Sequence, residues 1–323
     1  MSATRRPHII VALAFLLAAA SALAQGYPTR PVRVLVPFTP GGTVDIVARV
    51  LCAKLAADLG QPFIVENKPG AGGTIASAQL AKSPGDGYTL MVMSQALAYS
   101  ASLYSDLPYD TLRDLAPVAY VGATPNALVV TNALPVKTLQ EFLAYARANP
   151  GRISYGTAGI GSAGHLAVEL LQSLAGIRLT HVPYKGNAPA LTDLIGGQIQ
   201  ASLLTMPSVL PYVKSGKVRA IGTSGSRRSP VLPEVPTIAE AGVPGYEYTP
   251  WYGMIGPGTL PKELTARLNS AVNKALADAA VRDKLAQQGL EVLAMTSAQF
   301  TEIVRADVTR WGKFIRELGV RAD

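Results

Sequence analysis

The sequence predicts an α/β fold with largely parallel sheets. Short β-branched apolar runs alternate with longer segments of helical periodicity from residue 32 to the C-terminus. Several helical segments begin at a capping residue and end at glycine, which marks their limits. The chain has 323 residues, a length typical of about two domains.

The first part of the chain shows this alternation clearly. The run at 32–36 ends at Pro37, and the apolar residues over 45–59 have helical spacing up to the stop at Gly60. A glycine-rich loop over 67–73 precedes a helix that begins at Thr74. Strands are expected over 32–36, 63–65 and 88–93.

The middle of the chain continues the pattern. Thr138 and Glu141 form a capping box that starts a helix ending near 149–151, and Pro189 marks the first turn of another helix. A further helix follows a glycine-rich loop and runs to Leu174. Strands are expected over 126–131, 153–156, 179–182, 199–204 and 218–223.

The C-terminal part is mostly helical. An aromatic-rich extended segment over 246–255 precedes it, and capping boxes are expected at Thr237–Glu240 and Thr296–Gln299. The second of these opens a final helix to about Leu318. Two further helices are expected over 262–279 and 281–288.

The first 24 residues have the pattern of a secretory signal peptide. Arg5 and Arg6 precede an unbroken apolar run over 9–20, and Ala22-Leu23-Ala24 is a small-residue cleavage signal. The run is shorter than the roughly 20 residues of a membrane-spanning helix. We therefore expect residues 1–24 to direct export to the periplasm, with an uncleaved N-terminal anchor as the alternative.

Composition excludes several function classes. One cysteine, Cys52, and three histidines offer no typical set of metal ligands, so no metal site is expected. The net charge of +8 is spread thinly, and the longest basic run, Arg227-Arg228, has no interleaved aromatic residues. Nucleic-acid binding needs a clustered basic patch and is therefore not expected.

Cys52 lies among apolar residues and is expected to be a buried thiol.

Two glycine-rich loops connect a strand to a helix, over 36–45 and 154–165. Glycine lets the backbone approach a ligand closely, and a helix N-terminus presents free N–H groups to an anion. Neither loop contains lysine or arginine, which favours a carboxylate over a polyphosphate. A tight connection without a ligand is the alternative for each loop. Asp45 either complements the helix dipole or contacts the ligand.

The second loop also matches two enzyme motifs incompletely. Residues 159–164 fit G-x-G-x-x-G, but the next strand lacks the acidic residue of a dinucleotide site, and an exported protein has no such cofactor available. A hydrolase elbow would need glycine at Ile160. His165 and His181 are each expected to pack or support a loop more readily than to catalyse. No catalytic residue and no cofactor is therefore predicted.

Short motifs in the same order run through nearly all of the mature chain. They include Gly41-Gly42-x-x-Asp45 and Asp86-Gly87-Tyr88-Thr89-Leu90. The full set lies at 27–31, 37–45, 65–73, 86–90, 155–166, 181–186, 193–198, 216–220 and 233–237. With these motifs the sequence resembles the substrate-binding receptors of tripartite tricarboxylate transporters, the Bug-type periplasmic solute-binding proteins.

The resemblance implies a two-lobed, Venus-flytrap fold of the periplasmic-binding-protein type II-like class, with a mixed, mainly parallel sheet in each lobe. Chain order suggests that residues 26–124 and 250–323 form lobe 1 and residues 125–249 form lobe 2. A small organic carboxylate would lie between the lobes, held by backbone amides and bridging waters. The implied ligand-binding residues are Gly41, Gly42, Thr43, Asp45, Ser94, Gln95, Thr157, Ala158, Gly159, Ser162, His165 and Thr205.

The implied function is capture of the carboxylate and its delivery to membrane transporter subunits by a monomeric receptor. Two alternatives stay open: a periplasmic enzyme that uses His165 or His181 on the same carboxylates, and a ligand-sensing receptor for a signalling kinase. The ligand itself is open among dicarboxylates, tricarboxylates, aromatic acids and amino acids. Thr205 stands where family members often have Asp or Asn, and a hydroxyl cannot neutralise an ammonium group, which disfavours an amino acid.

Overall fold

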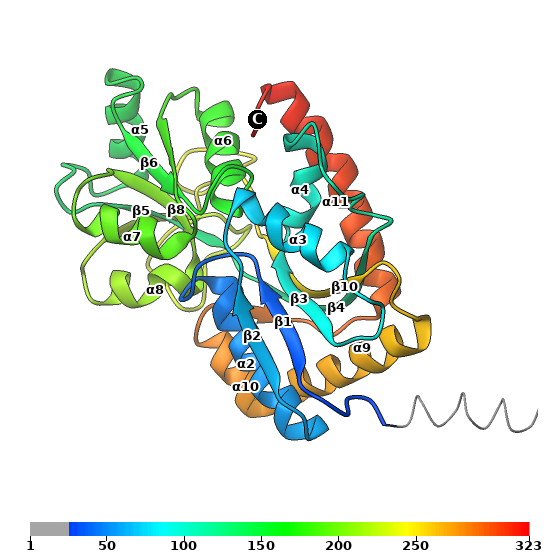
Figure 1. Ribbon diagram of the computed structural model, residues 1–323. Helices are drawn as coiled ribbons and strands as arrows, with labels where there is room; N and C mark the ends of the chain where they lie inside the picture. The colour runs from blue at the N-terminus through cyan, green and yellow to red at the C-terminus, as the bar shows by residue number, and fades with distance from the viewer. Residues whose placement is uncertain (1–25, 323) are drawn as a thin grey trace, which may run out of the picture.

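The structure, a computed structural model, describes residues 26–322. The predicted signal peptide lies outside these residues. Two β-sheets, each flanked by helices, form two lobes (Figure 1). The first lobe is defined here by the six-stranded sheet and the second lobe by the five-stranded sheet. Within the described residues, no helix combines the length and the apolar character needed to cross a membrane.

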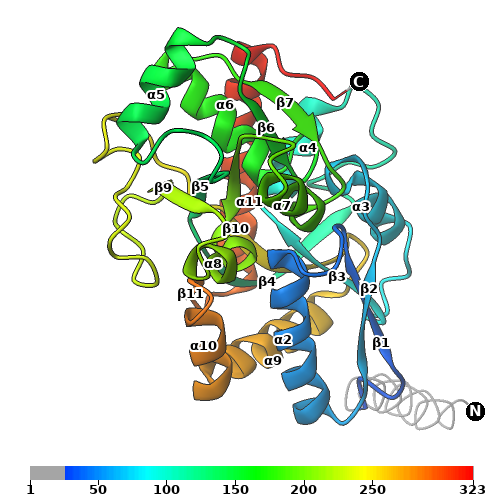
Figure 2. The same ribbon diagram turned by 90° about the vertical axis from the view of Figure 1, so that its left-hand side faces the viewer.

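The first lobe has the strand order β11-β4-β10-β3-β1-β2. Helices α2, α9 and α10 pack together on one face of its sheet, and α3, α4 and α11 pack together on the other (Figure 2). Its elements are β1 (Val32–Val36), α2 (Thr43–Leu59), β2 (Phe63–Asn67), η1 (Ala71–Gly73), α3 (Thr74–Ala81), β3 (Thr89–Ser94), α4 (Ala96–Leu103), β4 (Leu115–Ala123), β10 (Trp251–Pro257), α9 (Lys262–Ala277), α10 (Ala279–Ala286), β11 (Glu291–Val292) and α11 (Ser297–Leu318).

The second lobe has the strand order β7-β6-β8-β5-β9. Its elements are contiguous in the sequence, whereas the first lobe is assembled from both ends of the chain. They are β5 (Asn126–Val130), α5 (Leu139–Ala148), β6 (Ser154–Thr157), α6 (Ala163–Ala175), β7 (Thr180–Pro183), α7 (Asn187–Ile195), β8 (Ala201–Thr205), α8 (Met206–Lys214) and β9 (Arg219–Thr223).

The chain crosses between the lobes twice. The first crossing joins β4 to β5, and the second, over 224–250, leads from β9 to β10. Thr124 N donates to Pro250 O (3.3 Å), so the two crossings lie side by side. Tyr246 and Tyr248 anchor the second crossing to both lobes, because Tyr246 Oη donates to Ala167 O in α6 and the Tyr248 hydroxyl lies 2.6 Å from that of Tyr99 in α4. Paired crossings of this kind are typical of a hinge.

The sheets are mixed, as expected, and in each of them most strands run in the same direction, with antiparallel pairs around the strands that run the other way. In the first lobe β1 is parallel to β2 and β3, whereas the pairs β3–β10, β10–β4 and β4–β11 are antiparallel. In the second lobe β6 is parallel to β7 and β8, whereas β5 is antiparallel to β8 and β9.

The crossings explain the direction of β10 and β5. Tyr252, near the start of β10, pairs with Ser94 at the end of β3. Asn126, at the start of β5, pairs with Thr205 at the end of β8. A strand that arrives from the other lobe therefore enters its sheet at the interlobe edge, where the parallel strands end, and must run in the opposite direction.

Most predicted elements are present, with ends shifted by a few residues. Thr138 and Thr296 cap α5 and α11 as predicted. Thr237 and Glu240 exchange the two bonds of a capping box, but they close a single turn with no helix beyond it. The extended segment over 246–255 becomes a strand only at Trp251. The sequence patterns did not predict α4, β4, α8 or β11.

Candidate ligand-binding site

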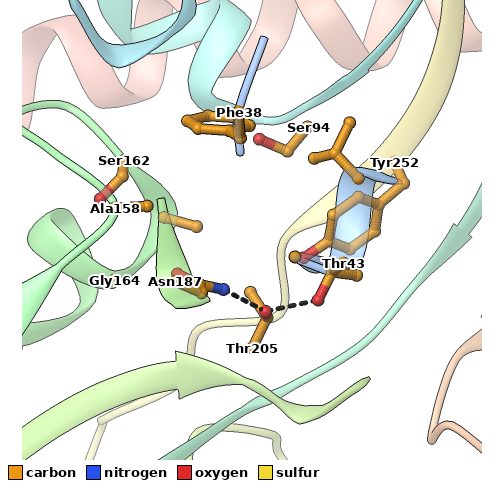
Figure 3. A pocket seen from close by; sticks show the side chains of 12 residues that line it. Phe38, Thr43, Ser94, Ala158, Ser162, Gly164, Asn187, Thr205 and Tyr252 are labelled. Carbon is orange, nitrogen blue, oxygen red and sulfur yellow. Dashed lines mark hydrogen bonds between the residues drawn. The ribbon is translucent and has the colours of Figure 1, made fainter. Parts of the chain in front are cut away.

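A cavity lies between the lobes, at the edge where β3, β6 and β8 end (Figure 3). It contains about 380 Å³ of space between atoms, including its open mouth. The lining residues are Phe38, Gly42, Thr43, Val44, Ser94 and Tyr252 of the first lobe, and Ala158, Ser162, Ala163, Gly164, Asn187 and Thr205 of the second.

Helices from both lobes begin at this cavity. Thr43 is the first residue of α2, Ala163 the first of α6 and Asn187 the first of α7, and all three line the cavity. The first N–H groups of an α-helix have no acceptor within the helix, and the helix dipole makes this end positive. The convergence of three such ends makes the cavity attractive to an anion.

The caps of these helices leave amide donors for a ligand. Residue Gly42 precedes α2 and Gly186 precedes α7, and neither provides a side-chain cap. Ser162 caps α6, but its hydroxyl accepts only from the N–H of His165, in the third position of the helix. The N–H groups at the first two positions of α2 and α6 are therefore available to an acceptor in the cavity.

The lining of the cavity has no side chain that is charged near neutral pH. Among its twelve lining residues, none is lysine, arginine, histidine, aspartate or glutamate. A bound anion would therefore be held by amide and hydroxyl donors, which suit a carboxylate. Phe38, Val44 and Ala158 add apolar surface that suits a short hydrocarbon segment.

A hydrogen-bonded network crosses the cavity. The hydroxyls of Thr43 and Thr205, which come from different lobes, hydrogen-bond to each other. Asn187 Nδ2 donates to Thr205 Oγ1 (2.7 Å) and to Ser208 Oγ (3.1 Å) (Figure 3). Ser208 Oγ in turn donates to Thr205 O (2.8 Å). The network joins α2 to α7 and α8.

The lobes approach each other closely around the cavity. A Cβ atom added at Gly186 would collide with Thr39 of the first lobe, and one added at Gly72 would lie 2.6 Å from Ile160 O of the second. Glycine at these two positions permits this approach of the lobes. The arrangement has the direct interlobe contacts of a closed receptor.

Half of the residues predicted to bind the ligand line the cavity. They are Gly42, Thr43, Ser94, Ala158, Ser162 and Thr205. The other half, Gly41, Asp45, Gln95, Thr157, Gly159 and His165, is not part of the lining.

Asp45 organises the first glycine loop. Its carboxylate accepts from Gly41 N (3.0 Å), Arg49 Nε (2.9 Å) and Asn67 Nδ2 (3.0 Å). Burial opposes the charged form, but these hydrogen bonds outweigh it and hold the pKa of Asp45 below its usual value. Asp45 thus positions Gly41 and Gly42 from behind.

Gln95 points toward the core of the first lobe. Its Nε2 donates to Asp307 Oδ2 of α11 (2.8 Å), which also accepts from Trp251 Nε1 (2.7 Å). This places the Gln95 amide in a buried polar cluster under the sheet. Ser94, one residue earlier at the end of β3, lines the cavity instead.

The histidines support the second glycine loop from behind. The His165 and His181 rings stack with centroids 4.2 Å apart, and Tyr155 stacks on the other side of His181 (4.9 Å). Gly161 N donates to His165 Nδ1 (3.2 Å), and the Thr157 hydroxyl lies 2.7 Å from His181 Nε2. Burial, with a contribution from His181, lowers the pKa of His165 to about 3, and burial lowers that of His181 to about 4.

Neither histidine is among the residues that line the cavity. The enzyme alternative therefore loses the two side chains on which it depended. Within residues 26–322, no group of three or more His, Cys, Asp or Glu side chains could hold a metal ion.

The other six lining residues were not predicted from the sequence. Phe38, Val44, Ala163 and Gly164 fall inside the two predicted loops, and their position next to the expected contacts was the available signal. Asn187 opens a helix that was predicted from Pro189. Tyr252 lies in a strand and carries no motif.

A family model described as "Tripartite tricarboxylate transporter family receptor" matches residues 47–320. The chain belongs to this family. BugT of Bordetella pertussis (strain Tohama I) is 40% identical over 306 residues, which cover 94% of this chain and 94% of BugT. The family assignment confirms the resemblance that the sequence motifs predicted.

Solved structures of similar receptors share the fold. An R. palustris protein solved with adipate is 37% identical with a TM-score of 0.88, and the match covers 91% of this chain and 98% of that one. MatC from Rhodopseudomonas palustris with bound malate is 35% identical with a TM-score of 0.85, over 89% of this chain and 99% of that one. The two-lobed, mixed-sheet architecture is therefore that of periplasmic binding proteins.

Proposed function

We propose that this receptor captures a small organic dicarboxylate between its lobes and delivers it to the membrane subunits of a tripartite tricarboxylate transporter. The observation that carries the proposal is the cavity without charged side chains, where the N-termini of α2 and α6 meet from opposite lobes. Amide donors on two sides match a molecule with a carboxylate at each end. The adipate and malate named for the two similar structures belong to this chemical class.

Binding is coupled to closure of the lobes. The first-lobe donors around Thr43 and the second-lobe donors around Ala163 come together only when the lobes approach each other. A ligand that contacts both sets binds the closed state more tightly and shifts the population toward it. The closed form would then present the surface that the transporter subunits recognise.

We also propose where the two lobes begin and end and that the receptor is a monomer. Lobe 1 would consist of residues 26–124 and 250–323 and lobe 2 of residues 125–249, with the two crossings as the hinge. The receptor would act as a monomer in the periplasm after removal of residues 1–24. Binding without turnover is the proposed activity, because no histidine, lysine, aspartate or glutamate lines the cavity to act as a base on its serine and threonine hydroxyls.

Thermal unfolding of the mature protein, stripped of ligand by unfolding and refolding, tests this proposal. The panel contains adipate, malate, succinate, citrate, benzoate, aspartate and glutamate. A ligand at 100 times its Kd adds about 2.7 kcal/mol to the free energy of unfolding and raises the Tm. We expect a rise with one or more dicarboxylates and recovery of the ligand unchanged. A flat panel, or conversion of the ligand, would contradict the proposal.

A further inference from the structure

One buried hydroxyl at the cavity lacks a hydrogen-bond partner. Tyr252, on β10, is 1% exposed and lines the cavity. Its Oη has no partner among the described residues. Buried hydroxyls are nearly always hydrogen-bonded, because removing one from water without compensation is costly. The Tyr252 hydroxyl is therefore placed to bind something that enters the cavity.

The nearest protein hydroxyls already have partners. The Thr43 and Thr205 hydroxyls lie near enough to Tyr252 Oη to oppose slightly the rise in its pKa (Figure 3), but neither is placed to hydrogen-bond with it, and the two threonines hydrogen-bond to each other. Thr205 Oγ1 also accepts from Asn187 Nδ2. Burial raises the pKa of Tyr252, which keeps the phenol protonated and able to donate.

The Tyr252 hydroxyl extends one of two sets of donors in the cavity. Figure 3 shows Tyr252 and Thr43 on one wall, with Ala158 and Ser162 on the opposite wall. The first wall thus combines the Tyr252 hydroxyl with the first amides of α2, and the opposite wall has the first amides of α6. Phe38 adds apolar surface to the lining between them.

We propose that Tyr252 Oη donates a hydrogen bond to the end of the ligand held at the N-terminus of α2, and thereby selects ligands that have a carboxylate at that end as well as at the α6 end. Tyr252 is then a specificity-determining residue for dicarboxylates over monocarboxylates of the same chain length. This inference rests on the proposed function, because it assigns one contact within the same site.

Substitution Tyr252→Phe tests the inference, because it removes the hydroxyl and keeps the ring. Calorimetric titrations use two pairs of probes: adipate with hexanoate, and malate with 3-hydroxybutyrate. We expect the variant to lose at least tenfold in affinity for a dicarboxylate that the wild type binds. The affinity for the matching monocarboxylate should change less than about threefold, so that the ratio within the pair falls.

A second readout separates ligand recognition from a structural role. Since the Tyr252 hydroxyl has no hydrogen-bond partner among residues 26–322, ligand-free Tyr252→Phe should have the wild-type Tm or a higher one. Tyr27→Phe is the matched control, because its buried hydroxyl lies away from the cavity and the crossings and donates to Gly87 O (2.6 Å). That variant should have a lower ligand-free Tm and wild-type dicarboxylate affinity.

The outcomes distinguish this inference from the proposed function. Unchanged dicarboxylate affinity in Tyr252→Phe, or a lowered ligand-free Tm, would overturn the inference and leave the proposed function intact. Equal losses for both members of a probe pair would also overturn it, because the hydroxyl would then not select the second carboxylate. A wild-type protein that binds no carboxylate would overturn the proposed function itself, and the inference with it.

Discussion

Thr43, the first residue of α2, and Thr205, the last residue of β8, hydrogen-bond to each other across the ligand cavity. The two hydroxyls belong to different lobes, so this bond is a direct interlobe link that needs no ligand. Asn187 Nδ2 donates to the same Thr205 oxygen and ties the link to α7. The closed arrangement is therefore partly stabilised by the protein itself, and a ligand adds to that stabilisation.

Substitution Thr205→Val should weaken ligand binding. The variant keeps the β-branched shape but loses the interlobe hydrogen bond and leaves Asn187 with one fewer acceptor. We expect a loss of about 1–2 kcal/mol in binding free energy, or roughly 5- to 30-fold in Kd, measured by calorimetric titration with the preferred dicarboxylate. Thr205→Ser retains the hydroxyl and should bind like the wild type. Equal affinity in the valine variant would show that the link does not assist closure.

Substitution Gly186→Ala should hinder closure of the lobes. Its Cβ would collide with Thr39, whereas the backbone at position 186 is extended (φ 167°) and imposes no conformational penalty on alanine. We expect at least a tenfold loss of affinity and a larger radius of gyration by small-angle scattering, with little change in ligand-free stability. The control is Gly196→Ala in the same lobe, where φ is −74° and the nearest neighbour lies at 3.4 Å. A compact Gly186→Ala variant with normal affinity would contradict the proposed approach of the lobes.

Acidification should destabilise the protein through His165 and His181. Their pKa values in the folded protein are about 3 and about 4, whereas unfolded histidine titrates near 6.5. Between pH 6.5 and 4 the unfolded chain therefore binds more protons than the folded one, and the free energy of unfolding falls as the pH decreases. The slope should approach about 1.4 kcal/mol per pH unit for each histidine. Urea unfolding at a series of pH values measures it.

The double variant His165→Asn with His181→Gln isolates this effect. The asparagine oxygen replaces Nδ1 as acceptor for Gly161 N, and the glutamine amide replaces Nε2 beside Thr157. We expect a clearly shallower pH dependence above pH 5, where the remaining carboxylates contribute little. A slope identical to that of the wild type would assign the acid sensitivity to other groups.

The sequence predicts the two glycine loops because their pattern is local. A strand, a glycine cluster and a helix start occur within about ten residues in both 36–45 and 154–165, and each loop contributes lining residues. Asp45 was ambiguous, because an acid in the first turn of a helix can serve either the helix or a ligand. Its hydrogen bonds to Arg49 and Asn67 assign it to the loop, and this pairing depends on the neighbouring strand β2.

Tyr252 and Asn187 were not predictable in this way. Tyr252 reaches the cavity only because β10 returns from the second lobe between β3 and β4. Asn187 reaches it because α7 begins beside Thr205 of β8. Both placements depend on long-range topology, which a single sequence does not display.

Proline residues explain why two elements, α8 and β4, were not predicted from the sequence. Helix α8 contains Pro207 in its first turn and Pro211 inside it, and strand β4 contains Pro117 opposite Ile255 at a register shift. Proline normally argues against a helix interior or a central strand. Here the short helix and the register irregularity accommodate it.

Gly159 is a poorer site for testing ligand binding than the loop pattern indicated. Its φ of 119° strains any other residue, and an added Cβ would lie 3.1 Å from Tyr184 O. A substitution there should disturb the loop itself. Gly42 lines the cavity with φ −80°, and an added Cβ would meet only Thr39 O at 3.7 Å. A side chain at Gly42 therefore tests the cavity without straining the backbone.

The most direct test of the account is calorimetric titration of wild-type, Gly42→Ala and Gly42→Leu proteins with adipate and malate. We predict one ligand per wild-type chain for at least one of the two acids, weaker binding to Gly42→Ala, and no binding to Gly42→Leu with wild-type circular dichroism and Tm. If Gly42→Leu binds the same acid with wild-type affinity and stoichiometry, the ligand does not occupy the cavity between α2 and α6, and the central claim is wrong.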